Sequence, residues 1–334
     1  MNKYPKVNYI GNKEKIVDWI IDCLPIKNGV VLDLFSGGCS LSYALKLSGF
    51  EVVTNDVLYS NYCISKALIE NSTIKLELKI DEDTIDNYYD EKIFQSIKWM
   101  VEKLYFREEV RELSSLISYS EKLKGNKKYL FLSLLRRAMI RKLPYSRMNI
   151  KWEEIVKFRD EELSYQKYKR RRAYHNKSFT YHIKDNLSAY NSAVFCNDKN
   201  NKSYQKDAFD MIKQYRKKVD LIYIDPPYPS TMNKYEEFYG AFDLMLQKNI
   251  SYSDFCNKEN FIENIKKLIQ ISYKKTKYFA ISLNNKSNPS YKELIESLED
   301  MVSKIYIHKR DHVYKVTGKE NKLSNYEVLL VLEV

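Results

Sequence analysis

The chain has 334 residues, 44% of them hydrophobic, and it carries a formal net charge of +12 at pH 7. This length favours one large domain together with a smaller one. No apolar run approaches the roughly 20 residues that would span a bilayer, and the N-terminus leads into no apolar signal segment, so we exclude a membrane protein and expect a soluble, cytoplasmic one.

The first part of the chain alternates helices and strands. Apolar residues at helical spacing predict a helix over residues 13–24. A short apolar run then predicts a strand at 30–34, which is followed by a glycine-containing loop and a helix over 41–48. The scheme repeats with a strand at 51–56 and a helix over 60–70. This alternation predicts a parallel sheet covered by helices.

The middle of the chain, residues 74–202, has charged helical segments and few strand signals. We interpret it as an insertion into a core made of residues 1–73 and 203–334. From Arg136 to Lys177 there are 14 Lys or Arg residues and five acids, which leaves a net charge of 14 − 5 = +9. Aromatic residues are interleaved with these cations. Cations for phosphates and aromatic rings for bases are what a nucleic-acid surface needs.

The alternation resumes after the insertion. An apolar strand is predicted at 219–224, and it runs directly into Asp225-Pro226-Pro227-Tyr228. Later strands are predicted at 278–283, 304–308 and 326–334. We expect the last two to form an antiparallel pair at the edge of the sheet.

Acids and glycines follow the predicted strands at their carboxyl ends, where open parallel sheets bind ligands. Asp33, Gly37, Asp56 and Asp225 would converge on one crevice there. A glycine lets the backbone come close to a ligand, and an acid after the second strand suits the two hydroxyls of a ribose. Many nucleoside and dinucleotide sites share this pattern.

Asp225 and the three residues after it are the strongest local signal. The two prolines fix the backbone and remove two N–H donors, so carbonyls are left free to accept hydrogen bonds. An amino group fits this arrangement, because the Asp225 carboxylate and the Pro226 carbonyl can take its two hydrogens while the Tyr228 ring stacks on the attached heterocycle. We predict that Asp225, Pro226, Pro227 and Tyr228 form the catalytic site.

The order of four segments resembles a known family, the Dam-like class of adenine-specific DNA methyltransferases. The segments are Tyr9-Ile10-Gly11-Asn12-Lys13, Asp33-Leu34-Phe35-Ser36-Gly37-Gly38, Asp56 and Asp225-Pro226-Pro227-Tyr228. The resemblance implies an α/β, Rossmann-like core that uses S-adenosylmethionine, with the mainly helical insertion as the target-recognition domain. It implies methylation of the N6 amino group of adenine in double-stranded DNA. It also suggests a restriction–modification system, in which a cognate restriction endonuclease would act without direct contact.

The resemblance also implies a set of cofactor-binding residues. Tyr9 and Lys13 would contact the methionine part of S-adenosylmethionine, Phe35 and Gly37 would shape its pocket, and Asp207 would lie next to its adenine. The complete set expected to bind the cofactor is Tyr9, Lys13, Asp33, Phe35, Gly37, Asp56, Asp207 and Asp225.

Cys39 departs from the family pattern, since many members have a glycine at this place. We therefore expect a stiffer loop here than in those members.

DNA contacts are expected in the insertion. The target base is paired inside the duplex, so it must be flipped out before its amino group can react, and the loop 230–239 is a candidate to close over it. Residues flanking Pro144-Tyr145 are expected near base edges, because Arg and Asn side chains suit guanine and adenine. The predicted DNA-binding set is Arg136, Arg137, Arg141, Lys142, Arg147, Asn149, Arg170, Arg171 and Arg172.

Three other hypotheses stay open at this point. Methylation of cytosine at its exocyclic N4 amine would use the same geometry, and an RNA methyltransferase would share the core. A nucleic-acid-binding module could keep the fold without activity. The intact motif at Asp225, together with Lys13 and Asp56, argues against the inactive module.

The cysteines and histidines give no signal for a disulfide framework or a metal site. The five cysteines are scattered without paired spacing. His308 and His312 stand four residues apart, but a third ligand is missing. We expect free thiols and no bound metal.

Overall fold

The computed structural model describes residues 2–169, 171–227, 229, 235–311 and 325–334. The chain divides into two compact units, each assembled from separate stretches. The helical unit consists of Met1–Asn12, Leu58–Cys196 and Glu236–Asn249. The sheet unit consists of Lys13–Val57, Asn197–Tyr235 and Ile250–Val334. No helix in the described parts of the chain is long and apolar enough to cross a membrane.

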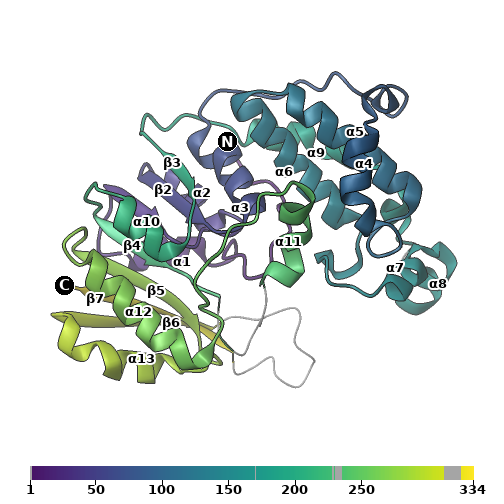
Figure 1. Ribbon diagram of the computed structural model, residues 1–334. Coiled ribbons are helices and arrows are strands. Elements are labelled where there is room, and N and C mark those ends of the chain that lie inside the picture. Colours follow the sequence, from purple (N-terminus) through teal and green to yellow (C-terminus); the bar gives the residue numbers. More distant parts are fainter. Residues whose placement is uncertain (1, 170, 228, 230–234, 312–324) are drawn as a thin grey trace. The chain divides into compact units, whose positions relative to one another are not determined.

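The sheet unit contains a seven-stranded sheet with the strand order β3-β2-β1-β4-β5-β7-β6 (Figure 1). Strands β1 to β5 are parallel, and β7 is antiparallel to both β5 and β6. The strands are β1 (Val30–Asp33), β2 (Glu51–Asp56), β3 (Lys202–Gln205), β4 (Leu221–Ile224), β5 (Tyr278–Asn284), β6 (Lys304–Asp311) and β7 (Tyr326–Glu333). The predicted α/β, Rossmann-like class is confirmed, and so is the antiparallel pair. Of this pair, β6 is the edge strand and β7 lies between β5 and β6.

Helices cover the sheet and bury its apolar side chains. Ile212 of α10, Ile265 of α12 and Leu294 of α13 belong to one buried hydrophobic cluster with Leu32 and Ile222 of the strands. Burial of each such side chain contributes about 1.5–3 kcal/mol. The helices of this unit are α1 (Val17–Cys23), α2 (Ser40–Leu47), α10 (Ala208–Gln214), α12 (Lys258–Ser272) and α13 (Tyr291–Leu298).

The first helix is shorter than the sequence predicts. The apolar spacing predicts a helix from residue 13, but α1 begins at Val17. Lys13 is instead tied into the sheet unit, where its backbone N–H donates to the Ser40 hydroxyl at 3.2 Å. Its side chain is bonded to Asp225. These contacts hold the residues before α1 in a different conformation.

The helical unit is built around α6, which packs against α3, α5 and α9. Its helices are α3 (Tyr59–Ser65), α4 (Glu91–Ile97), α5 (Arg107–Lys122), α6 (Gly125–Arg141), α7 (Trp152–Arg159), α8 (Glu161–Tyr168), α9 (Phe179–Ser192) and α11 (Tyr235–Met245), and a π-helical segment, Lys66–Glu70, continues α3. Both α3 and α11 lie outside the predicted insertion at 74–202. The functional division into a catalytic core and a target-recognition domain stays a prediction.

A buried ionic cluster joins three helical segments of this unit. Glu109 of α5 accepts from Arg159 of α7 at 2.7 Å and pairs with Lys142, just after α6, at 2.7 Å. The Lys142 side chain is only 1% exposed. Burial alone would raise the pKa of the Glu109 carboxyl, but the hydrogen bond from Arg159 and the charge of Lys142 hold it below its usual value. Lys142, which the sequence suggests as a DNA contact, is therefore engaged inside the protein.

We expect Glu109→Gln to destabilise the protein by about 3 kcal/mol at pH 7, because two buried cations lose their carboxylate. A lowered folded-state pKa means that this stabilisation is present above the ordinary value of 4.5 and is lost as the pH falls through the folded value. Urea unfolding across this pH range measures it.

The control is Glu154→Gln, because Glu154 forms an exposed pair with Lys157 at 3.8 Å. Exposed pairs contribute at most about 1 kcal/mol. An effect of Glu109→Gln no larger than this control at pH 7 would contradict a stabilising role for the cluster.

Candidate active site

Three acidic residues lie at the carboxyl ends of neighbouring strands. Asp33 ends β1, Asp56 ends β2, and Asp225 follows β4 directly. Because the strand order places β1 between β2 and β4, and all three run parallel, their carboxyl ends meet at one edge of the sheet. The predicted convergence of these acids therefore has its basis in the observed topology.

Lys13 is bonded to both oxygens of the Asp225 carboxylate. Its Nζ lies 3.0 Å from Oδ1 and 2.9 Å from Oδ2, and the two side chains are 7% and 17% exposed. Burial alone would lower the pKa of Lys13, but the negative charges of Asp225 and Glu327 raise it well above its usual value. A fixed positive charge thus orients the carboxylate that follows β4.

Glu327 was interpreted from the sequence only as part of the last strand. It lies on β7 opposite Asn284 of β5, and it is 2% exposed. Its charge is among those that raise the pKa of Lys13. The available sequence signal was an acid directly before the apolar run 328–332 of the predicted strand, because an acid buried there would need a partner.

Asp33 is the most deeply buried of the three acids. The Ser42 hydroxyl donates to its Oδ2 at 2.5 Å, while its Oδ1 has no hydrogen-bond partner among the described residues. Burial, together with the charges of Asp225 and Asp56 and against the opposing hydrogen bond from Ser42, raises the pKa of Asp33 to about 7. The charges of the two other acids act on Asp33 because the carboxyl ends of their parallel strands meet at the same edge of the sheet.

The glycine loop between β1 and α2 is held by Asp56. The Gly37 N–H donates to Asp56 Oδ2 at 2.8 Å, which fixes the orientation of this carboxylate. Cys39 is fully buried and has a φ of 64°, a left-handed conformation that glycine adopts more readily than other residues. Cys39 thus adopts a backbone conformation in which a glycine would be less strained. The expected stiffness of this loop stays a prediction.

Asp207 serves as the N-cap of α10. Its Oδ1 accepts from the Phe209 N–H at 2.9 Å, and its Oδ2 accepts from the Ser253 N–H at 2.6 Å. Both oxygens are therefore occupied by backbone donors. Contact of Asp207 with an adenine stays a prediction.

An aromatic group lies beside the glycine loop. The half-buried Phe35 ring meets Phe255 edge-on, with 5.0 Å between ring centroids, and Phe255 stacks on Phe209 at 5.7 Å. Sequence reasoning identified Phe35 but missed Phe255, because its segment carries no recognisable motif. Phe209 and Phe255 belong to the buried core of the sheet unit, and they support the half-buried Phe35 ring at its surface.

Tyr9 belongs to the helical unit. Its ring stacks on Tyr239 of α11 with 5.0 Å between centroids, and its hydroxyl accepts from the Asn61 amide at 3.4 Å. Tyr9 therefore has a fixed orientation within that unit.

Two predicted DNA contacts, Arg136 and Arg137, are buried in α6. They are 1% and 5% exposed. Arg136 donates to the Val7 carbonyl at 3.1 Å, and Arg137 donates to the Asn186 side chain at 2.6 Å. Like Lys142, they are engaged inside the helical unit, so the prediction of DNA contacts depends on the other members of the set.

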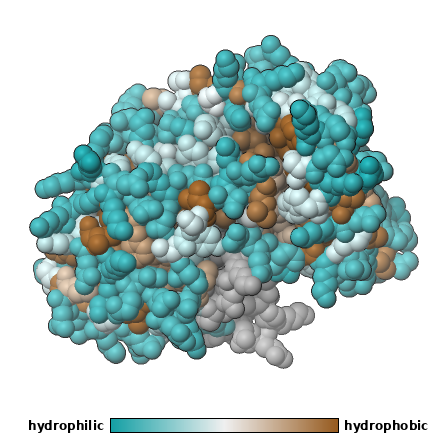
Figure 2. All heavy atoms as spheres, in the orientation of Figure 1, coloured by the Kyte–Doolittle hydropathy of each residue, from teal (hydrophilic) through white to brown (hydrophobic). Residues whose placement is uncertain are grey.

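The remaining described members lie nearer the surface. Asn149 is exposed, and the side chain of Arg171 is 64% exposed. Arg141, Arg147 and Arg172 are partly buried, and each lies near an aromatic ring, at 4.3, 5.7 and 5.3 Å from the centroid. Figure 2 shows a largely hydrophilic face with separate hydrophobic spots.

Some predicted residues lie outside the described part of the chain. They are Arg170, Tyr228, residues 230–234 of the predicted loop, and His312. Among the described residues, no group of three or more His, Cys, Asp or Glu side chains could hold a metal ion.

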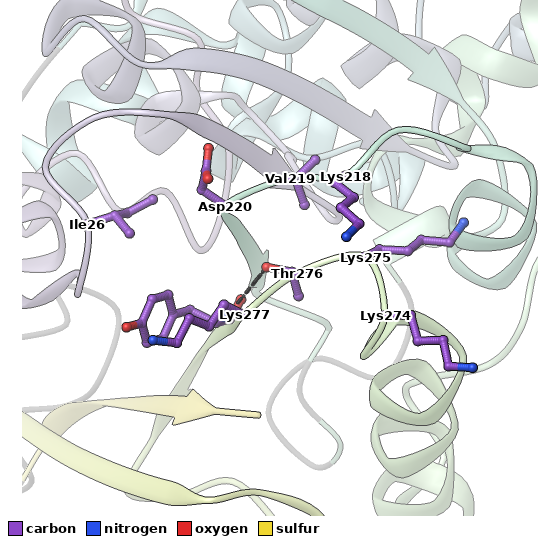
Figure 3. Close-up of a pocket in the computed structure, with 9 residues that line it drawn as sticks. Ile26, Lys218, Val219, Asp220, Lys274, Lys275, Thr276 and Lys277 are labelled. Carbon is purple, nitrogen blue, oxygen red and sulfur yellow. Dashed lines mark hydrogen bonds between the residues drawn. The ribbon is translucent and has the colours of Figure 1, made fainter.

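A separate hollow of about 390 Å³ lies at the amino ends of β4 and β5 (Figure 3). Four lysines line it: Lys218, Lys274, Lys275 and Lys277. Figure 3 shows the ammonium groups of Lys274, Lys275 and Lys277 pointing in different directions. Lys275 donates to backbone carbonyls at the end of α10, and Lys277 pairs with Glu333 at 3.0 Å. These cations do not converge on one ligand, so the hollow is not the candidate active site.

Comparison with known proteins gives two agreeing results. The model of the family described as D12 class N6 adenine-specific DNA methyltransferase matches residues 9–296. The protein named Type II methyltransferase M2.HphI, from Haemophilus parahaemolyticus, is 43% identical over 335 residues, which covers 99% of this chain and 98% of the relative.

The family match begins at Tyr9 and includes Asp33, Asp56 and Asp225. It confirms the predicted adenine-specific class over the alternatives of cytosine-N4 methylation, RNA methylation and an inactive binding module. The chain therefore belongs to the D12 class of N6 adenine-specific DNA methyltransferases.

Proposed function

We propose that this DNA adenine methyltransferase takes its methyl group from S-adenosylmethionine and acts on an adenine flipped out of the duplex at Asp225. The observation that carries the proposal is the buried Lys13–Asp225 pair at the carboxyl end of β4. It provides an oriented carboxylate immediately before Pro226, where an amino group would have to be received.

The residues at the sheet edge fit the proposed cofactor. When bound, S-adenosylmethionine would supply an electrophilic methyl carbon attached to a positively charged sulfur. Asp56 would contribute negative charge that suits the sulfonium, whereas Lys13 compensates the charge of Asp225 and the raised pKa of Asp33 leaves that group partly neutral at pH 7. We assign the ribose hydroxyls to Asp56, and the buried Asp33 Oδ1 offers a further acceptor without a partner among the described residues. Tyr9 and Lys13 are assigned to the methionine part.

Asp225 and Pro226 would orient the amine rather than bind the donor. The carboxylate and the proline carbonyl would each accept one N–H of the adenine amine, which directs its lone pair at the methyl carbon. As the nitrogen–carbon bond forms and the sulfur–carbon bond breaks, the amine would lose one proton to solvent. Lys13 keeps the carboxylate in place, because it contacts both oxygens.

The cations of the helical unit that lie at or near its surface are assigned to DNA. Arg141, Arg147, Arg171 and Arg172 would contact phosphates or bases, and Asn149 would contact a base edge. The exposed Tyr145 ring would face a base or a sugar. Arg170 is included on its position in the sequence alone.

A biological setting follows from the relative. Its name is that of a Type II methyltransferase. We propose that this protein likewise modifies the recognition sequence of a restriction–modification system in the cytoplasm, and that the cognate endonuclease recognises the same sequence separately.

We expect Asp225→Ala to lower methyl transfer by about 10³-fold, because the target amine loses its acceptor. DNA affinity should change little, since Asp225 is assigned to the amine and not to phosphates. Transfer of tritiated methyl groups to duplex DNA and a duplex-binding titration measure the two effects.

The control is Asp220→Ala. Asp220 lies just before β4, at the end of this strand opposite to Asp225, and its carboxylate accepts from the Val30 N–H. It should therefore be dispensable for transfer. Equal losses of duplex binding and of turnover in Asp225→Ala would contradict the assignment.

Charge reversal at Arg171 and Arg172 should flatten the dependence of log K on log salt, by up to about 0.9 for each phosphate that the variant no longer neutralises. The control reverses two lysines of the sheet unit, Lys218 and Lys274, and so changes the net charge equally. If the slope is unchanged in the arginine variant, or equal in both variants, Arg171 and Arg172 belong to a solvated surface and do not contact DNA phosphates.

Tyr228 variants test the proposed flipping. Stacking on an aromatic ring is worth about 1–3 kcal/mol per base, so we expect transfer rates in the order wild type, Tyr228→Phe, Tyr228→Ala. The fluorescence of 2-aminopurine at the target position should rise on binding, as the base leaves its neighbours. If Tyr228→Phe is as inactive as Tyr228→Ala, the hydroxyl and not the ring face is essential.

A further inference from the structure

Helix α11 (Tyr235–Met245) is the first described element beyond the catalytic motif. Its described side chains contact three segments of the helical unit that lie far apart in the sequence. These segments are the N-terminal motif, which here means Tyr9 and Ile10, the start of α3, and the loop after α6. All of these contacts lie within the helical unit.

Tyr239 fixes the N-terminal motif. Its side chain is fully buried, and its hydroxyl accepts from the Ile10 N–H at 2.8 Å. Its ring stacks on the Tyr9 ring with an angle of 21° between their planes. The Arg136 guanidinium lies 4.9 Å from the Tyr239 ring and 5.9 Å from the Tyr9 ring, so a buried cation holds the stacked pair.

The residue before Tyr239 is bonded to the loop that follows α6. The Phe238 carbonyl accepts from the Met148 N–H at 2.9 Å. The Arg147 guanidinium lies 5.4 Å from the Phe238 ring. A movement of this loop would therefore act on the residue next to Tyr239.

Asp243 anchors the other end of α11. Its two carboxylate oxygens accept from the Tyr59 N–H at 2.6 Å and the Ser60 N–H at 2.9 Å, at the start of α3. The side chain is 2% exposed. With its carboxyl half fixed in this way, α11 has little freedom to absorb a displacement at Phe238.

We propose that Tyr239 is a positioning residue that orients Tyr9 for the cofactor and ties this orientation to the DNA-contact loop at Arg147. The proposal rests on the proposed function, which assigns Tyr9 to the cofactor and Arg147 to DNA. DNA bound at the loop would stabilise the arrangement of Phe238 and Tyr239 that holds Tyr9, and cofactor bound at Tyr9 would stabilise the loop, since coupling is reciprocal.

The first test compares Tyr239→Phe with Tyr190→Phe. Tyr190 of α9 is 1% exposed, and its hydroxyl has no hydrogen-bond partner among the described residues, so the control removes a buried hydroxyl without breaking a described bond. Tyr239→Phe should raise KM for S-adenosylmethionine about tenfold, because the part-buried Ile10 N–H loses its acceptor and Tyr9 is no longer held in place. The kcat at saturating cofactor should match that of the control, and the melting temperature should fall by no more than about 4 °C.

Two outcomes of this test are distinct. A wild-type protein that transfers no label from S-adenosylmethionine to DNA would overturn the proposed function. An active wild type with the same KM in Tyr239→Phe and Tyr190→Phe would overturn only the positioning role of Tyr239.

The second test is a double-mutant cycle with Arg147→Ala, a loop substitution that leaves the buried core intact. Arg147→Ala alone should weaken DNA binding and also raise KM for S-adenosylmethionine. In the Tyr239→Phe background it should raise that KM no further, because the link is already broken. Additive effects of the two substitutions on KM would overturn the coupling.

Discussion

The ion pair between Lys13 and Asp225 joins residues 212 positions apart. It draws the segment before α1 to the end of β4 and shortens the first helix. A buried cation also needs its carboxylates, because an unpaired charge in this environment costs several kcal/mol. The sheet satisfies that need, since Asp225 after β4 and the buried Glu327 of β7 both lie near Lys13. The acids around Lys13 thus stabilise the folded sheet unit, in addition to the catalytic role proposed for Asp225.

The helical unit uses its charge in two different ways. Arg136, Arg137 and Lys142 are buried and bonded to groups of the same unit, while Arg171 is exposed. The positive charge counted along residues 136–177 therefore overstates the cationic surface available to a polyanion. Part of that charge holds the unit together, and only the remainder is available for long-range attraction of DNA.

Sequence patterns predicted β1, β2 and β4 well, because each has an apolar stretch that ends in an acid or runs directly into one. They missed β3 (Lys202–Gln205), whose Lys-Ser-Tyr-Gln sequence has no apolar run and becomes a strand only by pairing with β2. They also placed Arg136 on a surface. A signal against this was present, since apolar residues occur on all sides of α6 around it, which is typical of a buried helix. Lys13 was identified by resemblance, but its pairing with Asp225 depends on tertiary structure that no local pattern reveals.

The composition of the two units bears on how such enzymes could exchange target specificity. The chain passes from one unit to the other five times, so the helical unit is not one continuous cassette. A graft that replaced only residues 74–202 would bring in a foreign α6 and leave behind α3 and α11, which pack on it or bond to the loop after it. Recombination that preserves folding would have to transfer three separate stretches together, which includes the first 12 residues and the 14 from Glu236 to Asn249. Gradual substitution at exposed loop positions is therefore a more accessible route to new recognition sequences than wholesale domain exchange.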